Sequence, residues 1–271
     1  MQQTLSDAFQ IVGVGLHSGC SVQVEVLPGP PNSGFVFERT DLAGSPRVSA
    51  SWANVEPSRL ATRLVSNGAE VATVEHLLSA LYGMGVDNAL IRQNQIECPV
   101  LDGSALVWCD AISEVGIREQ AERRRVIQPS APFEHKENDR HLIFSAGDGF
   151  KIEIVTEFPW VGREQIVLEL TPDAYLKNVA WARTFGFEPD VEALRAAGLV
   201  KGGCLENALV LNENGPVNEG GFRGAGEVVR HKLLDLVGDL ALSGGRFAGH
   251  LRAQRPGHAF THKFLENLLR A

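Results

Sequence analysis

Three polar residues interrupt an otherwise apolar segment between residues 227 and 242. His231, Asp235 and Asp239 recur at every fourth position among valines and leucines. In an α-helix each step of four residues rotates the side chain by only about 40°, so the three stack along one face. An imidazole and two carboxylates beside an apolar surface are costly unless they are paired or bind a metal. The spacing leaves two interpretations open: zinc bound by His231 and Asp235, or a buried His–Asp hydrogen bond.

A second candidate pair, Glu75 and His76, lies in another predicted helix. A glutamate beside a metal ligand can reach a metal-bound water without binding the metal itself. No second histidine follows one turn later, so the pair is not an HExxH motif. Catalytic zinc uses three protein ligands and one open position, and His76, His231 and Asp235 would form such a set. The alternative is a surface glutamate next to a core histidine.

A third candidate, His258, follows Pro-Gly at the predicted start of the last helix. A positioned histidine suits a general acid, and Asp239 could keep its imidazolium charged and aligned. The alternative is an ordinary histidine in the first turn of a helix. We expect the remaining histidines to be structural or exposed: His17, His135, His141, His250 and His262. For His17 the alternative is that its glycine-rich turn approaches a ligand.

Hydrophobic periodicity and glycine punctuation predict both strands and helices in each half of the chain. Strands are predicted at 20–26, 35–38, 86–92, 141–145, 150–156, 165–170, 208–211 and 246–252. Helices are predicted at 73–84, 105–115, 173–181, 190–197, 227–242 and 259–269. Thr73 is the expected N-cap of the first helix, and Gly85 follows its end. This mixture predicts an α+β fold built from layers of sheet and helix.

Two of the predicted helices share a pattern that indicates an internal duplication. His76 is followed by Gly83, and His231 by Gly238, each after six intervening residues and before a predicted strand. Chance similarity between two amphipathic helices is the alternative. The basic run at 123–125 indicates a connection. We therefore expect a first α+β domain at 1–120 and a second at 121–271, with the boundary near 118–124.

The composition excludes several classes of protein. The 271 residues carry 25 Lys and Arg against 33 Asp and Glu, a net charge of −8, which disfavours binding nucleic acid over the whole surface. No segment is apolar over the roughly 18 residues that a membrane-spanning helix needs, and the N-terminus does not resemble a signal peptide. The four cysteines are widely spaced, without a CxxC motif, so we expect a reducing, cytoplasmic setting.

Six short motifs, taken in order, resemble those of the zinc-dependent UDP-3-O-acyl-N-acetylglucosamine deacetylases of lipid A biosynthesis. They are GVGLHSG (13–19), TVEHLLSAL (73–81), VLDGSA (100–105), ARTFGF (182–187), RHKLLDLVGDL (230–240) and PGHA (256–259). The resemblance implies two similar two-layer α/β sandwich domains with the active site between them. It also implies a small insert in each domain, the second near 188–212, where it would help to form an apolar tunnel for the acyl chain.

The resemblance also assigns roles to the residues of the three candidate groups. It implies that His76, His231 and Asp235 bind one Zn²⁺, a position that Fe²⁺ can also occupy. Glu75 would be the general base, and His258 the charged acid that protonates the leaving amine. These implied roles agree with the chemistry that the residue types and spacing favour.

The resemblance also implies that Asp239 orients His258, a role that the residues themselves suggest. The roles of three further residues come from the resemblance alone. Lys232 and Thr184 would contact the substrate and the reaction intermediate, and Phe185 would lie near the sugar nucleotide. The implied reaction is hydrolysis of the N-acetyl group, the committed step of lipid A biosynthesis, by a cytoplasmic monomer without nucleic-acid partners. Two alternatives stay open: a paralogous zinc deacetylase for another acetylated amino sugar, and a catalytically silent metal-binding homologue. Glu75 and His258 argue against silence, because neither is needed to hold zinc.

Overall fold

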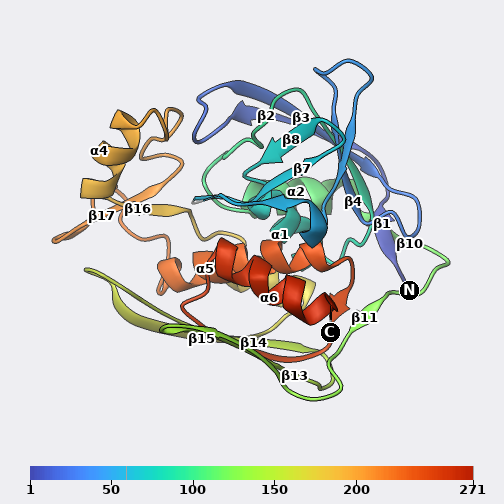
Figure 1. Cartoon of the computed structure of the whole chain (residues 1–271). Helices are drawn as coiled ribbons and strands as arrows, with labels where there is room; N and C mark the ends of the chain where they lie inside the picture. Colours follow the sequence, from blue (N-terminus) through green and yellow to red (C-terminus); the bar gives the residue numbers. More distant parts are fainter. Residues whose placement is uncertain (59, 271) are drawn as a thin grey trace.

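Two five-stranded sheets enclose a layer of helices in the computed structural model, which describes residues 1–58 and 60–270 (Figure 1). The first sheet has the order β2-β3-β9-β4-β5, and the second β12-β13-β20-β14-β15. The first comprises β2 (Phe9–Val14), β3 (Ser21–Pro28), β4 (Phe35–Arg39), β5 (Arg47–Ser49) and β9 (Ala89–Gln93). The second comprises β12 (Phe133–Glu137), β13 (Arg140–Ser145), β14 (Phe150–Phe158), β15 (Gly162–Glu169) and β20 (Gly249–Gln254).

The two sheets have the same topology. In each, the fifth strand in chain order lies in the centre, antiparallel to the second strand and parallel to the third. One helix precedes this central strand and another follows it. These are α1 (Glu75–Gly83) and α2 (Leu106–Val115) in the first half, and α5 (Glu227–Leu240) and α6 (His258–Arg270) in the second. The shared topology supports the duplication that the His-x6-Gly pattern suggested and agrees with the predicted α+β class.

Each half also carries a small sheet between its fourth strand and the helix that precedes its central strand. In the first half it comprises β6 (Val55–Glu56), β7 (Arg63–Ser66) and β8 (Ala69–Ala72), preceded by the 3₁₀ turn η1 (Trp52–Asn54). In the second it comprises β16 (Phe185–Phe187), β17 (Leu209–Asn212) and β18 (Gly215–Pro216), with helix α4 (Glu188–Ala196). This second unit contains the predicted insert range 188–212 and projects to the left in Figure 1.

Short elements connect these layers. They are β1 (Gln3–Leu5), β10 (Ile117–Glu119), β11 (Val126–Ile127), α3 (Pro172–Asn178), η2 (Ala241–Ser243) and β19 (Arg246–Phe247). Strand β1 pairs with β10, and β11 with β19. The predicted domain boundary near 118–124 falls between β10 and β11 and stays a prediction. Within the described residues, no helix combines the length and apolarity that crossing a bilayer requires.

Helices α1 and α5 pack against each other between the sheets, and this contact positions the site (Figure 1). Gly238 of α5 permits the close approach, because a Cβ added there would lie 2.1 Å from the carbonyl oxygen of Glu75. Most of the buried apolar side chains of both halves form one continuous cluster around these helices. The start of α1 is therefore held directly against the last turn of α5.

Most predicted helices and strands are present within a few residues of their expected limits. The assignment of Thr73 as an N-cap is wrong: α1 begins at Glu75 after Val74, and the Thr73 hydroxyl donates to Glu97 instead. The segment predicted as one strand at 246–252 is divided into β19 and β20, because Gly249 adopts a φ of +133° beside the Ser145 carbonyl.

Candidate active site

A cavity of about 520 Å³ opens where α1, α5 and the start of α6 meet. Both halves of the chain contribute to its walls, which carry both charged and apolar side chains. The lining residues include Leu16, His17, Leu60, Glu75, His76, Arg140, Phe158, Thr184, Phe185, His231, Lys232, Asp235 and His258. Eight of the nine residues proposed from the sequence therefore face one cavity, and the ninth, Asp239, lies directly behind His258.

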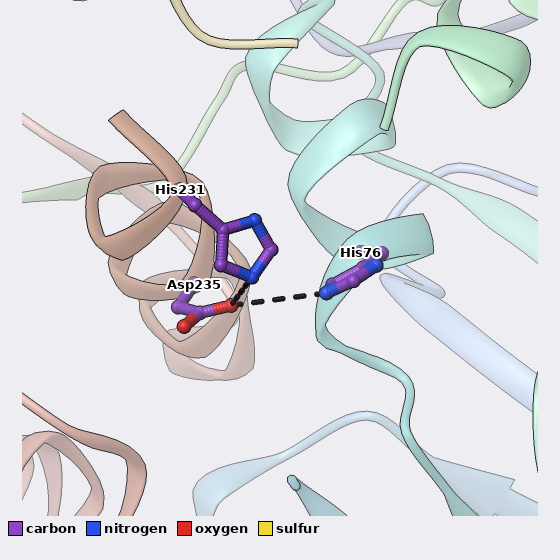
Figure 2. Close-up of side chains that lie close together, drawn as sticks. All are labelled: His76, His231 and Asp235. Atoms are coloured by element: carbon purple, nitrogen blue, oxygen red, sulfur yellow. Dashed lines mark ion pairs between the residues drawn. The ribbon is translucent and has the colours of Figure 1, made fainter. Parts of the chain in front are cut away.

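His76 of α1 faces His231 and Asp235 of α5 across the helix contact (Figure 2). Asp235 Oδ1 lies 3.4 Å from His231 Nε2 and 3.9 Å from His76 Nε2, and the three donor atoms all lie within 4.8 Å of one another. At zinc–ligand lengths of about 2.0–2.2 Å, tetrahedral ligand atoms lie roughly 3.4 Å apart. The two-nitrogen, one-oxygen donor set is thus suited to hold one metal ion at the wall of the cavity.

The protonation states of these three side chains also suit metal binding. Burial, together with repulsion from His231, lowers the pKa of His76 to about 3, so its imidazole is neutral and has a free lone pair. Burial lowers the pKa of His231 as well, and its Nδ1–H donates to the carbonyl of Ala182 at 3.0 Å, leaving Nε2 for a metal. Burial opposes ionisation of Asp235, but Lys232 and the neighbouring histidines outweigh it and lower the pKa of this carboxyl.

Glu75 is the first residue of α1 and is almost completely buried. One carboxylate oxygen, Oε2, accepts a hydrogen bond from the backbone N–H of Thr62 at 3.0 Å. Burial raises the pKa of Glu75 to about 7, although attraction to His258 acts in the opposite direction. A carboxyl with this pKa can accept and release a proton near neutral pH, as a general base requires.

His258 begins α6, as the sequence predicted, and points its Nδ1 toward Asp239. Nδ1 lies 2.9 Å from both carboxylate oxygens. Burial alone would lower the pKa of His258, but the charge and hydrogen bond of Asp239 outweigh it and raise the pKa to about 9. The imidazolium is therefore stable at neutral pH. Its Nε2 lies 3.8 Å from Glu75 Oε1, so the candidate acid and base face each other beside the three donor atoms.

Lys232 and Thr184 complete the polar wall. Lys232 Nζ donates to Asp235 Oδ2 at 2.5 Å, which leaves Oδ1 on the side of the two histidines. Thr184 and the neighbouring Phe185, at the start of β16 in the same half, also line the cavity, and the Phe185 ring packs edge-on against His231 at 6.0 Å. The structure thus brings the residues that only the resemblance had assigned into the same cavity.

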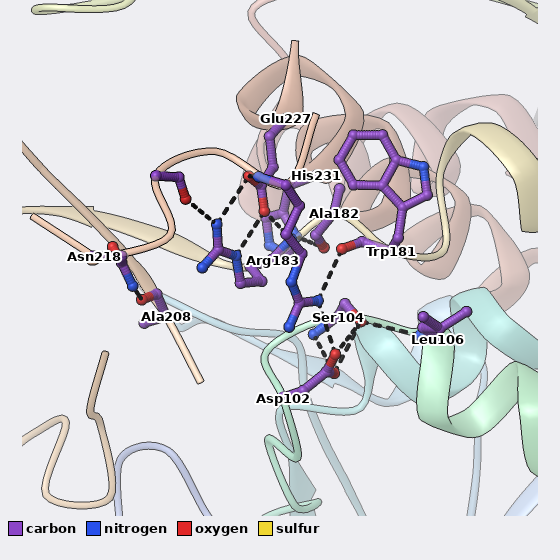
Figure 3. A network of polar contacts seen from close by, with 12 residues as sticks. Asp102, Ser104, Leu106, Trp181, Ala182, Arg183, Ala208, Asn218, Glu227 and His231 are labelled. Carbon is purple, nitrogen blue, oxygen red and sulfur yellow. Dashed lines mark hydrogen bonds and ion pairs between the residues drawn. The ribbon is translucent and has the colours of Figure 1, made fainter. Parts of the chain in front are cut away.

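The loop that carries Thr184 is held by contacts from both halves (Figure 3). The Thr184 N–H donates to the carbonyl of Gly103, which belongs to the VLDGSA motif of the first half. Arg183 forms a buried ion pair with Glu227 at 2.8 Å, the first residue of α5. Farther along, Arg223 bridges to Asp102 at 2.8 Å. These contacts fix the Ala182 carbonyl that orients His231.

Sequence reasoning missed two polar residues that organise the cavity. Thr62 donates its backbone N–H to Glu75 and its hydroxyl to Asp239 at 2.6 Å. Glu97 accepts from the backbone N–H groups of His17 and Ser18 at 2.8 Å, which holds the glycine-rich turn against the site. Neither lies in a helical repeat or beside another candidate, so the sequence offered no spacing signal for them.

His262, which we expected to be structural or exposed, contacts one of the candidate site residues. His262 lies one turn after His258, and its Nε2 is 3.1 Å from Asp239 Oδ1. The available signal was the i, i+4 spacing from His258, which places both rings on one face of α6. His17, expected to be structural or exposed, lines the cavity, which agrees with the alternative that its glycine-rich turn approaches a ligand.

Comparisons with known proteins agree with this geometry. Residues 2–270 match the family described as UDP-3-O-acyl N-acetylglycosamine deacetylase. The UDP-3-O-acyl-N-acetylglucosamine deacetylase of Solibacter usitatus is 40% identical over 259 residues, covering 95% of this chain and 88% of that protein. Those of Acidithiobacillus ferrooxidans and Xanthomonas campestris pv. campestris (strain B100) are 39% and 40% identical over 272 residues, covering 99% of this chain and 90% of each relative.

Proposed function

This chain belongs to the UDP-3-O-acyl-N-acetylglucosamine deacetylase family, and on that premise we propose how its own residues perform the reaction. The enzyme hydrolyses the N-acetyl group of UDP-3-O-acyl-N-acetylglucosamine in lipid A biosynthesis and releases acetate. The family is metal-dependent, and we assign the metal to His76, His231 and Asp235. The observation that supports this assignment is the juxtaposition of three buried donor atoms with the Glu75–His258 pair.

We propose zinc as the metal, because two neutral imidazoles and one carboxylate are a common donor set for catalytic zinc. When bound there, zinc would polarise the acetamide carbonyl and make a water molecule more acidic. The chain's own contribution is to keep the ligands in place: α1 supplies His76, and α5 supplies His231 and Asp235 on one face. The second-half loop supplies the carbonyl that selects the correct tautomer of His231.

Glu75 and His258 divide the proton transfers between them in this mechanism. The Glu75 carboxylate accepts a proton from the attacking water, and the Thr62 N–H holds its other oxygen in position. His258 donates the proton on Nε2 to the amide nitrogen as the C–N bond breaks, so the amine leaves neutral. Asp239 stabilises the imidazolium before the transfer. Because the two side chains lie on adjacent walls, neither has to move far between steps.

The remaining cavity residues would bind the substrate. We propose that Thr184 and Lys232 contact the oxygen that gains negative charge, and that Phe185 packs near the sugar nucleotide. Phe158, Phe185 and Phe187 form an apolar cluster with strand β17 where the second small sheet meets the cavity. This cluster is our candidate wall for the acyl chain. A monomeric state and a cytoplasmic location complete the proposal.

Acetate release from purified protein tests the assignment of substrate and metal. We expect about one zinc ion per chain and strong preference for UDP-3-O-acyl-N-acetylglucosamine over UDP-N-acetylglucosamine. Chelation should abolish release and added Zn²⁺ should restore it. Restoration by Fe²⁺ alone would replace zinc as the native metal in the proposal. Release from another acetylated amino sugar, but not from this substrate, would indicate a paralogous deacetylase, and a metal-loaded protein inactive on both would indicate a silent homologue.

The metal-ligand assignment has its own test. His76→Ala and His231→Ala should each lose zinc, whereas His141→Ala, on the far face of the second sheet, should retain it. Zinc content is measured by atomic spectroscopy after dialysis, with unfolding temperature as a check on folding. Full zinc occupancy in a folded His76→Ala or His231→Ala variant would contradict the assignment.

A further inference from the structure

His262 contacts the candidate acid's partner from the side opposite to the cavity. It lies one helical turn after His258 in α6, and the two imidazole rings are stacked, with centroids 6.2 Å apart and planes inclined by 27°. Its side chain is only 12% exposed, and Nε2 lies 3.1 Å from Asp239 Oδ1. Asp239 thus receives two histidines from the same helix face.

Thr62 closes the group from the first half of the chain. Its hydroxyl lies 2.6 Å from Asp239 Oδ1 and 3.1 Å from His262 Nε2. A hydroxyl has one hydrogen and two lone pairs. It can donate that hydrogen to the carboxylate and share with Asp239 Oδ1, as a second acceptor, the single hydrogen on His262 Nε2. The hydroxyl, the carboxylate and both histidines therefore satisfy one another.

The direction of the hydrogen bond from His262 follows from its neighbours. An ionised carboxylate can only accept, so Nε2 of His262 carries a hydrogen whether the ring is neutral or charged. Asp239 itself is buried, with a side chain 1% exposed, and it makes its contacts through fixed protein groups. Each donor on Oδ1 restricts rotation of the carboxylate about its Cβ–Cγ bond. The plane so fixed is the one that places both oxygens 2.9 Å from His258 Nδ1.

We propose that His262 is a positioning residue for deacetylation: its Nε2–H, together with the Thr62 hydroxyl, locks the Asp239 carboxylate that aligns His258. This inference rests on the proposed role of His258 as the acid. His262 touches neither the cavity nor the metal ligands. Its effect reaches the reaction only through Asp239, which lies between it and His258.

The competing explanation is that His262 only fills space, and the position of its ring makes this explanation testable. The ring also lines a second cavity of about 350 Å³ between α6 and η1, beside Trp52 and Pro57. If His262 only filled that space, any side chain of similar volume would replace it. If the N–H donor of His262 is required for turnover, only a side chain with a donor near the position of Nε2 can replace it.

The test compares His262→Leu, which removes the donor, with His262→Gln, whose amide nitrogen can reach Asp239. We expect kcat for acetate release to fall roughly 10- to 100-fold in His262→Leu, because a small misplacement of a reacting group has effects of that size. KM, zinc content and unfolding temperature should stay near the wild-type values. His262→Gln should recover most of the lost kcat. His141→Leu, the same exchange on the outer sheet face, should match the wild type.

A double-mutant cycle separates positioning from packing. In an Asp239→Asn background, His262→Leu should lower kcat by less than about 2-fold, because the group it acts through is already lost. Unchanged kcat in His262→Leu, an equal loss in His262→Gln, or additive losses with Asp239→Asn would each overturn the proposal. Absence of acetate release from the wild-type protein would instead refute the proposed function, so the two failures are distinguishable.

Discussion

The two halves of the chain share one strand order, yet their central helices contribute different chemistry. Aligning the His-x6-Gly patterns pairs His76 with His231, so that both helices direct an imidazole into the same cavity. The residue before each histidine differs: α1 has the buried carboxylate of Glu75, and α5 has Arg230, which stacks on Trp181. The two halves thus each place one candidate ligand in the cavity, while the other candidate residues differ between them.

The residue types also differ at corresponding positions in the following turns of the two helices. Asp235 and Asp239 of α5 correspond to Ala80 and Met84 of the first half. The third candidate ligand and the partner of the acid therefore both come from α5. Burial does not explain the difference, because Met84 is only half-buried whereas Asp239 is 1% exposed. The comparison teaches that charged partners, and not exposure, allow these carboxylates: Asp235 is paired with Lys232, and Asp239 with His258, although both carboxylates are buried.

Substitution of the residue before each histidine should give the largest difference in kcat between the two halves. Glu75→Gln should lower kcat by about 10²- to 10⁴-fold, the usual contribution of a general base, while zinc stays bound. Arg230→Gln should keep kcat near the wild-type value, because this side chain bonds to backbone carbonyls away from the cavity. Steady-state acetate release and zinc content measure both. A fully active Glu75→Gln variant would refute its role as base.

The paired glycines give the next contrast. Gly238→Ala places a Cβ 2.1 Å from the Glu75 carbonyl oxygen, and Gly83→Ala places one 2.5 Å from the Tyr175 ring. We expect each to lower the free energy of unfolding by about 1–3 kcal/mol or more. Only Gly238→Ala should also lose zinc and activity, because it separates α1 from α5 at the ligands. Thermal unfolding and zinc content test this prediction. Equal loss of zinc in Gly83→Ala would contradict the expected difference between the two glycines.

The pH dependence assigns one limb of the activity profile to each half. Glu75 must be ionised, and because burial raises its pKa to about 7, kcat/KM should fall as the pH drops below about 7. His258 must be protonated, and Asp239 raises its pKa to about 9 against the effect of burial, so kcat/KM should fall above about pH 9. Each limb should approach about ten-fold per pH unit. A flat profile between pH 5 and 10 would contradict both assignments.

The smallest expected effect on activity lies at a junction outside the catalytic cavity. Asp87 of the first half pairs with Arg124 of the connection and with Arg246 of the second half, at 2.8 and 2.7 Å. Asp87→Asn should lower the free energy of unfolding by about 1–3 kcal/mol, because two half-buried guanidinium groups lose their counter-charge. Turnover of the folded enzyme should be unchanged. Urea unfolding and kcat test this, and a large loss of kcat would show that the junction also positions the site.

Much of the secondary structure was predictable because the signals were local. The apolar runs with glycine stops placed α1, α2 and α5, and alternation placed β3 and β14. The short strands β6, β7, β16 and β18 were not predicted, since two to four residues carry too little periodicity. Thr73 is a residue type typical of an N-cap, but its hydroxyl donates to Glu97, a tertiary contact that the local sequence does not reveal.

The candidate site shows the same division between local and tertiary information. Spacing on one helix was enough to align His231, Asp235 and Asp239, because helix geometry fixes which side chains share a face. That Glu75 and His76 face them depended on the packing of α1 against α5. Without the resemblance, Thr184 and Phe185 carried no signal of their own, because a loop position reveals its neighbours only after folding.

The sequence by itself determined the residue types able to bind a metal and move protons, their spacing along each helix, and membership of a family. Only the tertiary structure decided that Thr62 and His262 converge on Asp239, because these residues are far apart in sequence and meet through packing. It also decided the protonation states, since burial raises the pKa of Glu75 and lowers that of His76. Burial is a property of the folded chain, which no spacing of residues encodes.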